Sequence, residues 1–170
     1  MKDEFEQEIQ DEMKYLKLKQ MLEKADNAVL VASGTTAATG VVPIPFADAP
    51  MIVAQQVALM ATICGIFEID IEKDGLKALA MAALGASGAT IIGKTIATNL
   101  FKLIPGAGTV VGGAISAGTS GVVTLAMGKA FIEVCKAVNM GKLSEDDITS
   151  SKGVNMLKNA FKDQLRKNKK

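Results

Sequence analysis

The sequence contains no histidine and no tryptophan, and it has only one tyrosine. Without histidine, the chain lacks the side chain that most often acts as a general base or a metal ligand. Its two cysteines, Cys64 and Cys135, lie in separate apolar segments, and no CxxC or zinc-type spacing occurs. We therefore expect two buried, reduced thiols, no metal, no cofactor and no catalytic residue, which predicts that the protein is not an enzyme.

Charge is nearly balanced but unevenly placed. The net charge of +1 predicts no general attraction to nucleic acid. Acids prevail at the start and bases at the end, and uncharged runs of 21, 19 and 26 residues begin at Asn27, Ala49 and Leu103. We divide the chain into an amphipathic N-terminal helix (1–26), a hydrophobic double-hairpin domain (27–139) and a basic C-terminal helix and tail (140–170).

Two amphipathic helices are expected at the ends of the chain. In the first, over residues 3–25, apolar residues recur at steps of four, four and three, at Phe5, Ile9, Met13 and Leu16. This helix either docks on its own domain or couples to a partner. In the second, Ser144 with an acid three residues later predicts a helix start. Its apolar face consists of Val154, Leu157, Phe161 and Leu165.

The interior predicts an all-α fold with two glycine- and alanine-rich helical hairpins. The first has limbs over 27–42 and from Ala49 to about Phe67, since proline disfavours helix in the residue before it and is tolerated in a first turn. Gly75 is the expected turn before a second hairpin with limbs 76–101 and 109–138. Asp48 is interpreted as a helix cap. The residues assigned to the hairpin tips are Pro43, Pro45, Phe46, Asp48, Pro50, Pro105 and Gly106.

Residues 88–95 match the phosphate-binding pattern GxxxxGK[ST]. That loop works between a strand and a helix, where its backbone N–H groups surround phosphates. Here the preceding residues 78–84 are strong helix formers, and no strand is expected. We therefore predict that the segment is helical and binds no nucleotide.

Small residues recur every four positions in two segments, which marks helix-packing faces. The faces consist of Gly85, Ala89, Gly93 and Ala97, and of Gly108, Gly112, Ser116, Ser120, Thr124 and Gly128. Such faces allow close helix contact in membranes, and the same packing also serves a soluble bundle. We expect the second face to make the tightest helix–helix contact in the molecule, with the first face as its neighbour.

The uncharged runs are long enough for membrane-spanning helices. Against easy spanning, Gln55 and Gln56 interrupt one run, Lys94 lies in the third limb, and interfacial aromatic residues are scarce. If the hairpins insert, both tips lie on one side, and the N-terminal helix, the linker and the basic tail lie on the other. The pattern therefore favours membrane association, and self-association into a homo-oligomer stays open.

Segments 40–50, 103–113 and 124–128 (GVVPIPFADAP, LIPGAGTVVGG and TLAMG) carry a family resemblance. They resemble the bacterial domain of unknown function found in YcjF-like membrane proteins and at the C-terminus of Era-like GTPases, over about residues 32–136. The resemblance implies a helical, membrane-associated module that accompanies a GTPase. The short segment before it is too small for a G domain and no NKxD motif occurs, so the GTPase is expected to be a separate chain.

These observations predict a non-catalytic helical module on the cytoplasmic side of a bacterial cell membrane, where it positions or regulates a partner such as a separate GTPase. The alternative is a soluble cytoplasmic helical bundle that binds another protein through its basic C-terminal helix. Pore formation by the glycine-rich hairpins is a third interpretation.

Overall fold

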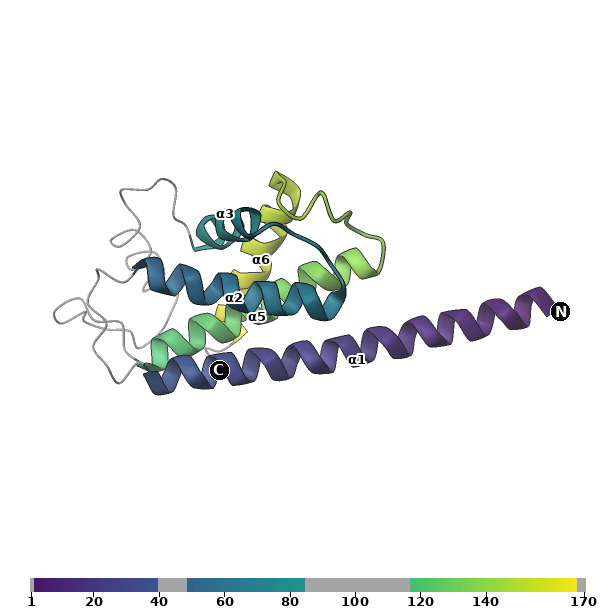
Figure 1. Cartoon of the computed structure of the whole chain (residues 1–170), viewed down its shortest axis with the longest axis horizontal. Helices are drawn as coiled ribbons and strands as arrows, with labels where there is room; N and C mark the ends of the chain where they lie inside the picture. The colour runs from purple at the N-terminus through teal and green to yellow at the C-terminus, as the bar shows by residue number, and fades with distance from the viewer. Residues whose placement is uncertain (1, 40–48, 85–116, 168–170) are drawn as a thin grey trace.

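The computed structural model describes residues 2–39, 49–84 and 117–167 (Figure 1). These residues form five α-helices and no strand, which confirms the all-α prediction. The helices are α1 (Lys2–Thr39), α2 (Ala49–Phe67), α3 (Lys73–Ala83), α5 (Ala117–Asn139) and α6 (Ser151–Lys167). The proposed hairpin tips lie outside the described residues, apart from Pro50 in the first turn of α2.

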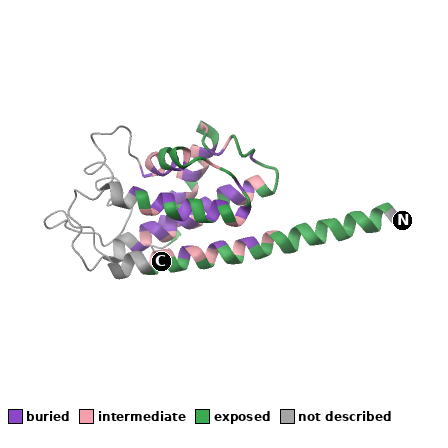
Figure 2. Cartoon of the chain, viewed as in Figure 1, coloured by how far each residue is buried: buried purple, intermediate pink, exposed green. Residues whose placement is uncertain are grey.

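Helix α1 is a single 38-residue helix, so the two helices expected over 3–25 and 27–42 are continuous. No proline or glycine occurs between Lys2 and Ser33 to end it. The change from charged to uncharged sequence near residue 26 marks a change of environment instead. Residues 3–17 are exposed, whereas buried positions recur from Met21 onward (Figure 2).

Helix α5 lies at the centre of the bundle and runs antiparallel to α1. Met21 of α1 accepts a hydrogen bond from Asn139 near the end of α5, 3.8 Å from nitrogen to sulfur. Farther along α1, the Asp26 carboxylate pairs with the Lys129 ammonium at 2.7 Å. As the residue numbers of these contacts rise along α1, those of their partners in α5 fall, as antiparallel helices require. The two contacts also fix the register of α1 on α5.

Helix α2 also packs on α5, but the two run parallel. The Gln56 amide nitrogen of α2 donates to the hydroxyl of Thr124 at 3.0 Å, and Cys64 lies against Cys135. The residue numbers of these two contacting pairs rise together along α2 and α5, as parallel helices require. Buried apolar residues of all five described helices, including Met60, join these helices into one core.

Two helices end in the same way, with a residue in the left-handed region. Gly141 (φ 70°) follows α5, and the N–H of Lys142 donates to the Ala137 carbonyl at 2.8 Å. Glu68 (φ 59°) follows α2, and the N–H of the next residue reaches back to the Cys64 carbonyl at 3.0 Å. Both arrangements satisfy carbonyls at a helix C-terminus, and only Gly141 does so without steric cost.

Gly75 lies inside the first turn of α3, so its assignment as the turn before a second hairpin is wrong. The chain reverses earlier, at Glu68, and α3 follows directly. At Gly75 an added Cβ would lie 3.1 Å from the Thr149 methyl group. The glycine therefore allows α3 to approach the loop before α6 closely.

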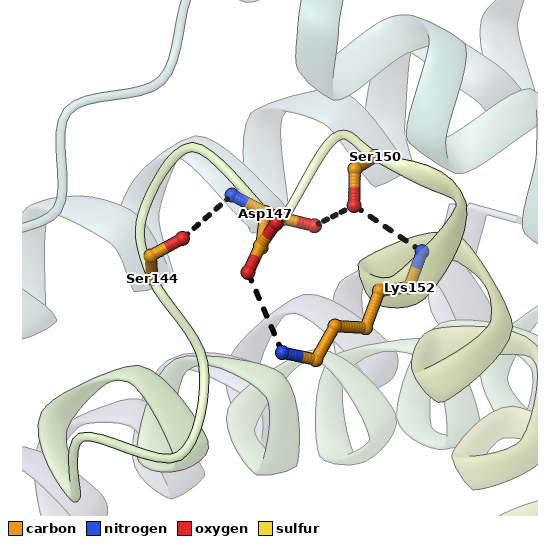
Figure 3. Close-up of polar contacts among 4 residues, drawn as sticks. All are labelled: Ser144, Asp147, Ser150 and Lys152. Atoms are coloured by element: carbon orange, nitrogen blue, oxygen red, sulfur yellow. Dashed lines mark hydrogen bonds and ion pairs between the residues drawn. The ribbon is translucent and has the colours of Figure 1, made fainter.

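The loop before α6 corrects the predicted helix start at Ser144 (Figure 3). The Ser144 hydroxyl does accept a hydrogen bond from the Asp147 N–H, at 3.2 Å, but this closes a turn. Helix α6 begins at Ser151, and the hydroxyl of Ser150 accepts from the Lys152 N–H at 3.2 Å as its cap.

Helix α6 buries the apolar face that the sequence predicts. Leu157, Phe161 and Leu165 are buried, and Val154 packs against the core at partial exposure. Because these residues recur at steps of three and four, they form one side of the helix. They cover α5 and α3.

Four helix ends meet at one end of the bundle. The end of α1 at Thr39, the start of α2 at Ala49, the end of α3 at Ala83 and the start of α5 at Ala117 all lie there, and the N-terminus lies at the opposite end (Figure 1).

Candidate functional site

Two residues of the small-residue faces, Thr124 and Gly128, have described side-chain surroundings. Both are buried between α5 and its neighbours α1 and α2. Ser120 belongs to α5, but the surroundings of its side chain are not among the described features. The other members, for which packing stays a prediction, are Gly85, Ala89, Gly93, Ala97, Gly108, Gly112 and Ser116.

Gly128 lies at a close approach of α5 to α1. A Cβ added there would lie 2.5 and 2.8 Å from the two γ-carbons of Val29, and 3.1 Å from a δ-carbon of Leu59 in α2. Val29 is fully buried and, as a β-branched residue in a helix, has one strongly preferred rotamer. The small-residue face therefore makes a three-helix contact at this position.

A polar pair lies one helical turn from Gly128. Gln56 is 1% exposed and Thr124 is 2% exposed. The Gln56 nitrogen has its partner in the Thr124 hydroxyl, but the side-chain oxygen of Gln56 has none. Burial of an unpaired acceptor is costly, so the pair limits how α2 and α5 align rather than adding much stability.

Both cysteines are buried and reduced, as the sequence predicts. The Cys64 and Cys135 thiols come from α2 and α5 and lie beside each other in the core. Interaction with the Cys64 thiol, together with burial, raises the pKa of the Cys135 thiol well above its ordinary value. A protonated, buried thiol is a poor nucleophile, so the pair acts as part of the core.

The residues expected at the tips lie mostly beyond the description. Pro50 is in the first turn of α2, where the sequence places it. The others are Pro43, Pro45, Phe46, Asp48, Pro105 and Gly106, and the interpretation of Asp48 as a cap stays a prediction. Residues 88–95, with the phosphate-loop pattern, also lie outside the described ranges.

The first half of α1 is the largest exposed feature of the described chain. Residues 3–17 project past the other helices and are exposed along their whole length (Figure 2). Large apolar side chains stand in solvent there: Phe5 (64% exposed), Ile9 (42%), Met13 (64%), Tyr15 (66%) and Leu16 (49%). The second half of α1 docks on its own domain, as one of the two interpretations expects, and the first half is left uncovered. Coupling of this helix to a partner stays a prediction.

A second surface is the outer side of α6. Its basic residues point away from the buried face, and the exposed ones are Lys152, Lys162, Arg166 and Lys167. The Lys152 ammonium lies 3.4 Å from the Asp147 carboxylate (Figure 3), and Arg166 lies 3.7 Å from Asp163. Exposed pairs of this kind contribute little stability, so most of the basic charge remains available to solvent.

The described ranges contain no cluster of three or more metal-ligating side chains. An open groove between α1 and α2 is lined by residues that include Lys17, Met21, Thr62 and Glu68. Lys17 and Glu68 pair across it at 2.7 Å, and both side chains are mostly exposed. In the part of the chain that the structure covers, no helix is both long and apolar enough to cross a bilayer.

Fold and surface thus define an all-helical domain with a projecting amphipathic arm. The chain belongs to the family described as a domain of unknown function, DUF697, whose model matches residues 5–170. No curated protein and no solved structure matches the chain significantly. The family therefore agrees with the domain of unknown function expected from the sequence.

Proposed function

We propose that this domain is a non-catalytic helical module that associates with a membrane through one end of its bundle. One observation carries the proposal. The helix ends that flank segments 40–48 and 85–116 all lie at the same end (Figure 1), and these two segments are the least charged connections in the sequence.

The chemistry of the two segments suits a lipid surface. Segment 85–116 contains two lysines and no acid among its 32 residues, and segment 40–48 contains one acid and no base. Aliphatic residues enter the acyl boundary, while lysines reach back to anionic headgroups. The acidic first half of α1 projects from the opposite end, where it would avoid an anionic surface.

The bound module positions or regulates a protein partner on the cytoplasmic face of a bacterial membrane. A separate GTPase is the partner that the YcjF-like and Era-like resemblance implies. The non-catalytic assignment rests on the lack of histidine and on the burial of both thiols. The chain therefore supplies a surface, and the chemistry belongs to the partner.

Vesicle flotation tests the membrane step. The purified chain is mixed with vesicles of phosphatidylethanolamine and phosphatidylglycerol, and we expect it to float. Ile91→Asp with Ile92→Asp should reduce the bound fraction, because charge is expensive at the acyl boundary. Met140→Asp is the matched control, since Met140 is an exposed apolar residue (48%) just beyond the far end of α5. Wild-type protein that stays at the bottom of the gradient overturns the proposal.

Binding to a GTPase encoded beside this chain tests the partner step. Calorimetry with the purified GTPase should show binding that depends on the bound nucleotide, and lack of binding in the GDP and GTP-analogue states contradicts this step. Addition of ATP or GTP with Mg²⁺ to this chain alone should give no heat of binding.

The basic outer side of α6 favours a second candidate function, a soluble helical bundle that binds an acidic protein surface. Exposed lysines and Arg166 support it. Vesicle flotation separates the two functions, because a soluble bundle stays at the bottom of the gradient and a membrane-associated module floats with the vesicles.

A further inference from the structure

The apolar residues of the projecting arm, defined as residues 3–18 of α1, lie on the side of the helix that faces away from the bundle. At seven-residue steps, Ile9 and Leu16 are followed by Glu23 and Leu30, which are exposed. Leu18, which packs on the core, is followed by Ala25, which is buried. No continuation of the bundle along α1 would therefore cover Phe5, Ile9, Met13 and Leu16.

Charge divides the same arm into two unlike halves. Residues 3–12 hold six acids and no base, whereas residues 13–20 hold three lysines and no acid. Two such helices side by side in parallel would bring like charges together. In antiparallel orientation, the acidic half of each helix faces the basic half of the other.

Symmetry selects the same arrangement. The exposed apolar residues of the arm, Phe5, Ile9, Met13 and Leu16, are centred near Gln10 and Asp11. A two-fold axis there sets Phe5 opposite Leu16 of the second copy and brings Ile9 beside Met13.

We propose that two copies of this chain pair through their arms as an antiparallel helix pair. The interface is isologous, with the same apolar face on both sides. It uses the end of the molecule opposite to the proposed membrane contact, so the two activities are separable by mutation.

Sedimentation equilibrium of the full chain tests the pairing. We expect a monomer–dimer equilibrium whose dissociation constant rises by on the order of 100-fold in Ile9→Ser with Leu16→Ser, since the dimer loses four buried aliphatic side chains. Tyr15→Ser is the matched control, because Tyr15 is a large exposed side chain (66%) on another side of the arm. A wild-type monomer at every concentration, or an equal effect of the control, overturns the proposal.

Charge reversal tests the orientation. Glu6→Lys with Glu8→Lys should weaken the dimer about tenfold, and Lys17→Glu with Lys19→Glu in the same chain should restore it, because these lysines flank the outward apolar face. In a parallel pair the first substitution would leave like charges facing like charges and change little, which contradicts the proposal.

Cross-linking tests directly which residues of the two arms lie close together. A short thiol cross-linker should join a Phe5→Cys chain to a Leu16→Cys chain, and neither variant to itself, while the native cysteines are buried. Self-linking of Phe5→Cys overturns the register. If the serine double variant instead abolishes flotation and the wild type is monomeric, the arm binds lipid and the pairing is wrong. The variant at Ile91 and Ile92 tests the membrane contact independently.

Discussion

Alanine at Gly128 should destabilise the fold, although alanine is the better helix former. The added methyl group would lie 2.5 and 2.8 Å from the Val29 γ-carbons, about 1 Å inside ordinary carbon contact. Val29 is fully buried and has no alternative rotamer of low energy. Helices α1 and α5 would have to separate, which also strains the ion pair between Asp26 and Lys129.

The magnitude follows from two opposing effects. Overpacking costs roughly 1–3 kcal/mol, and the gain in helix propensity from glycine to alanine returns about 1 kcal/mol. We expect a net loss of up to about 2 kcal/mol, or a melting temperature up to about 8 °C lower for a chain of this size. Thermal denaturation followed by circular dichroism measures it.

A second glycine, in α1, should respond to alanine with the opposite change in stability. Gly34 lies in α1 with nothing within 4 Å of an added Cβ, so Gly34→Ala should raise stability by up to about 1 kcal/mol. The double variant Gly128→Ala with Val29→Ala should be more stable than the sum of its parts by about 1 kcal/mol or more, because the clash disappears. If Gly128→Ala stabilises as Gly34→Ala does, or if the two effects simply add, the close contact at Gly128 is refuted.

Three further predictions concern the helix ends and the core. Gly153→Ala should cost roughly 2–4 kcal/mol in a denaturant titration, because the new Cβ would meet backbone carbonyls before α6 that cannot rotate away; unchanged stability would contradict this packing. Glu68→Gly should add about 0.5–1 kcal/mol by relieving the left-handed conformation, and Lys17→Ala, which removes only the exposed ion pair, should change less. A thiol reagent should modify Cys64 and Cys135 only as fast as the bundle opens, so rapid labelling of native protein would show that they are accessible.

The sequence predicts most accurately the elements whose signals are local. Helix α2 occupies the uncharged run that begins at Ala49, with Pro50 in its first turn, and it ends at Phe67 where charged residues begin. In α6 the steps of three and four predict the buried face correctly. Both patterns depend only on residues that are close in the sequence. They can therefore be recognised without knowledge of tertiary contacts.

Other features of the fold depend on contacts with elements that are distant in the sequence. The composition change near residue 26 resembles a boundary, but α1 continues because a helix needs no change of backbone when it passes from solvent onto a bundle. Gly75 resembles a turn residue, but it serves close packing against Thr149. The periodicity of Phe5, Ile9 and Leu16 predicts an apolar face and cannot predict that the bundle leaves it uncovered.

The small-residue face of α5 combines a feature that the sequence predicts with neighbours that it does not. The four-residue repeat correctly places Thr124 and Gly128 at helix contacts, because small side chains at one spacing form one face. The neighbours seen there are α1 and α2, which lie far from α5 in the sequence. The predicted packing of segment 85–97 on this face lies outside the described residues and stays a prediction.

Depth-dependent quenching can locate the proposed membrane contact at one end of the bundle. An environment-sensitive dye is attached at Ile104→Cys, within segment 85–116, or at Met140→Cys beyond the far end of α5. With vesicles that carry spin-labelled acyl chains, we expect a blue shift and strong quenching of the dye at position 104, and neither change at position 140. Quenching at position 140 alone, or at neither position, would contradict it.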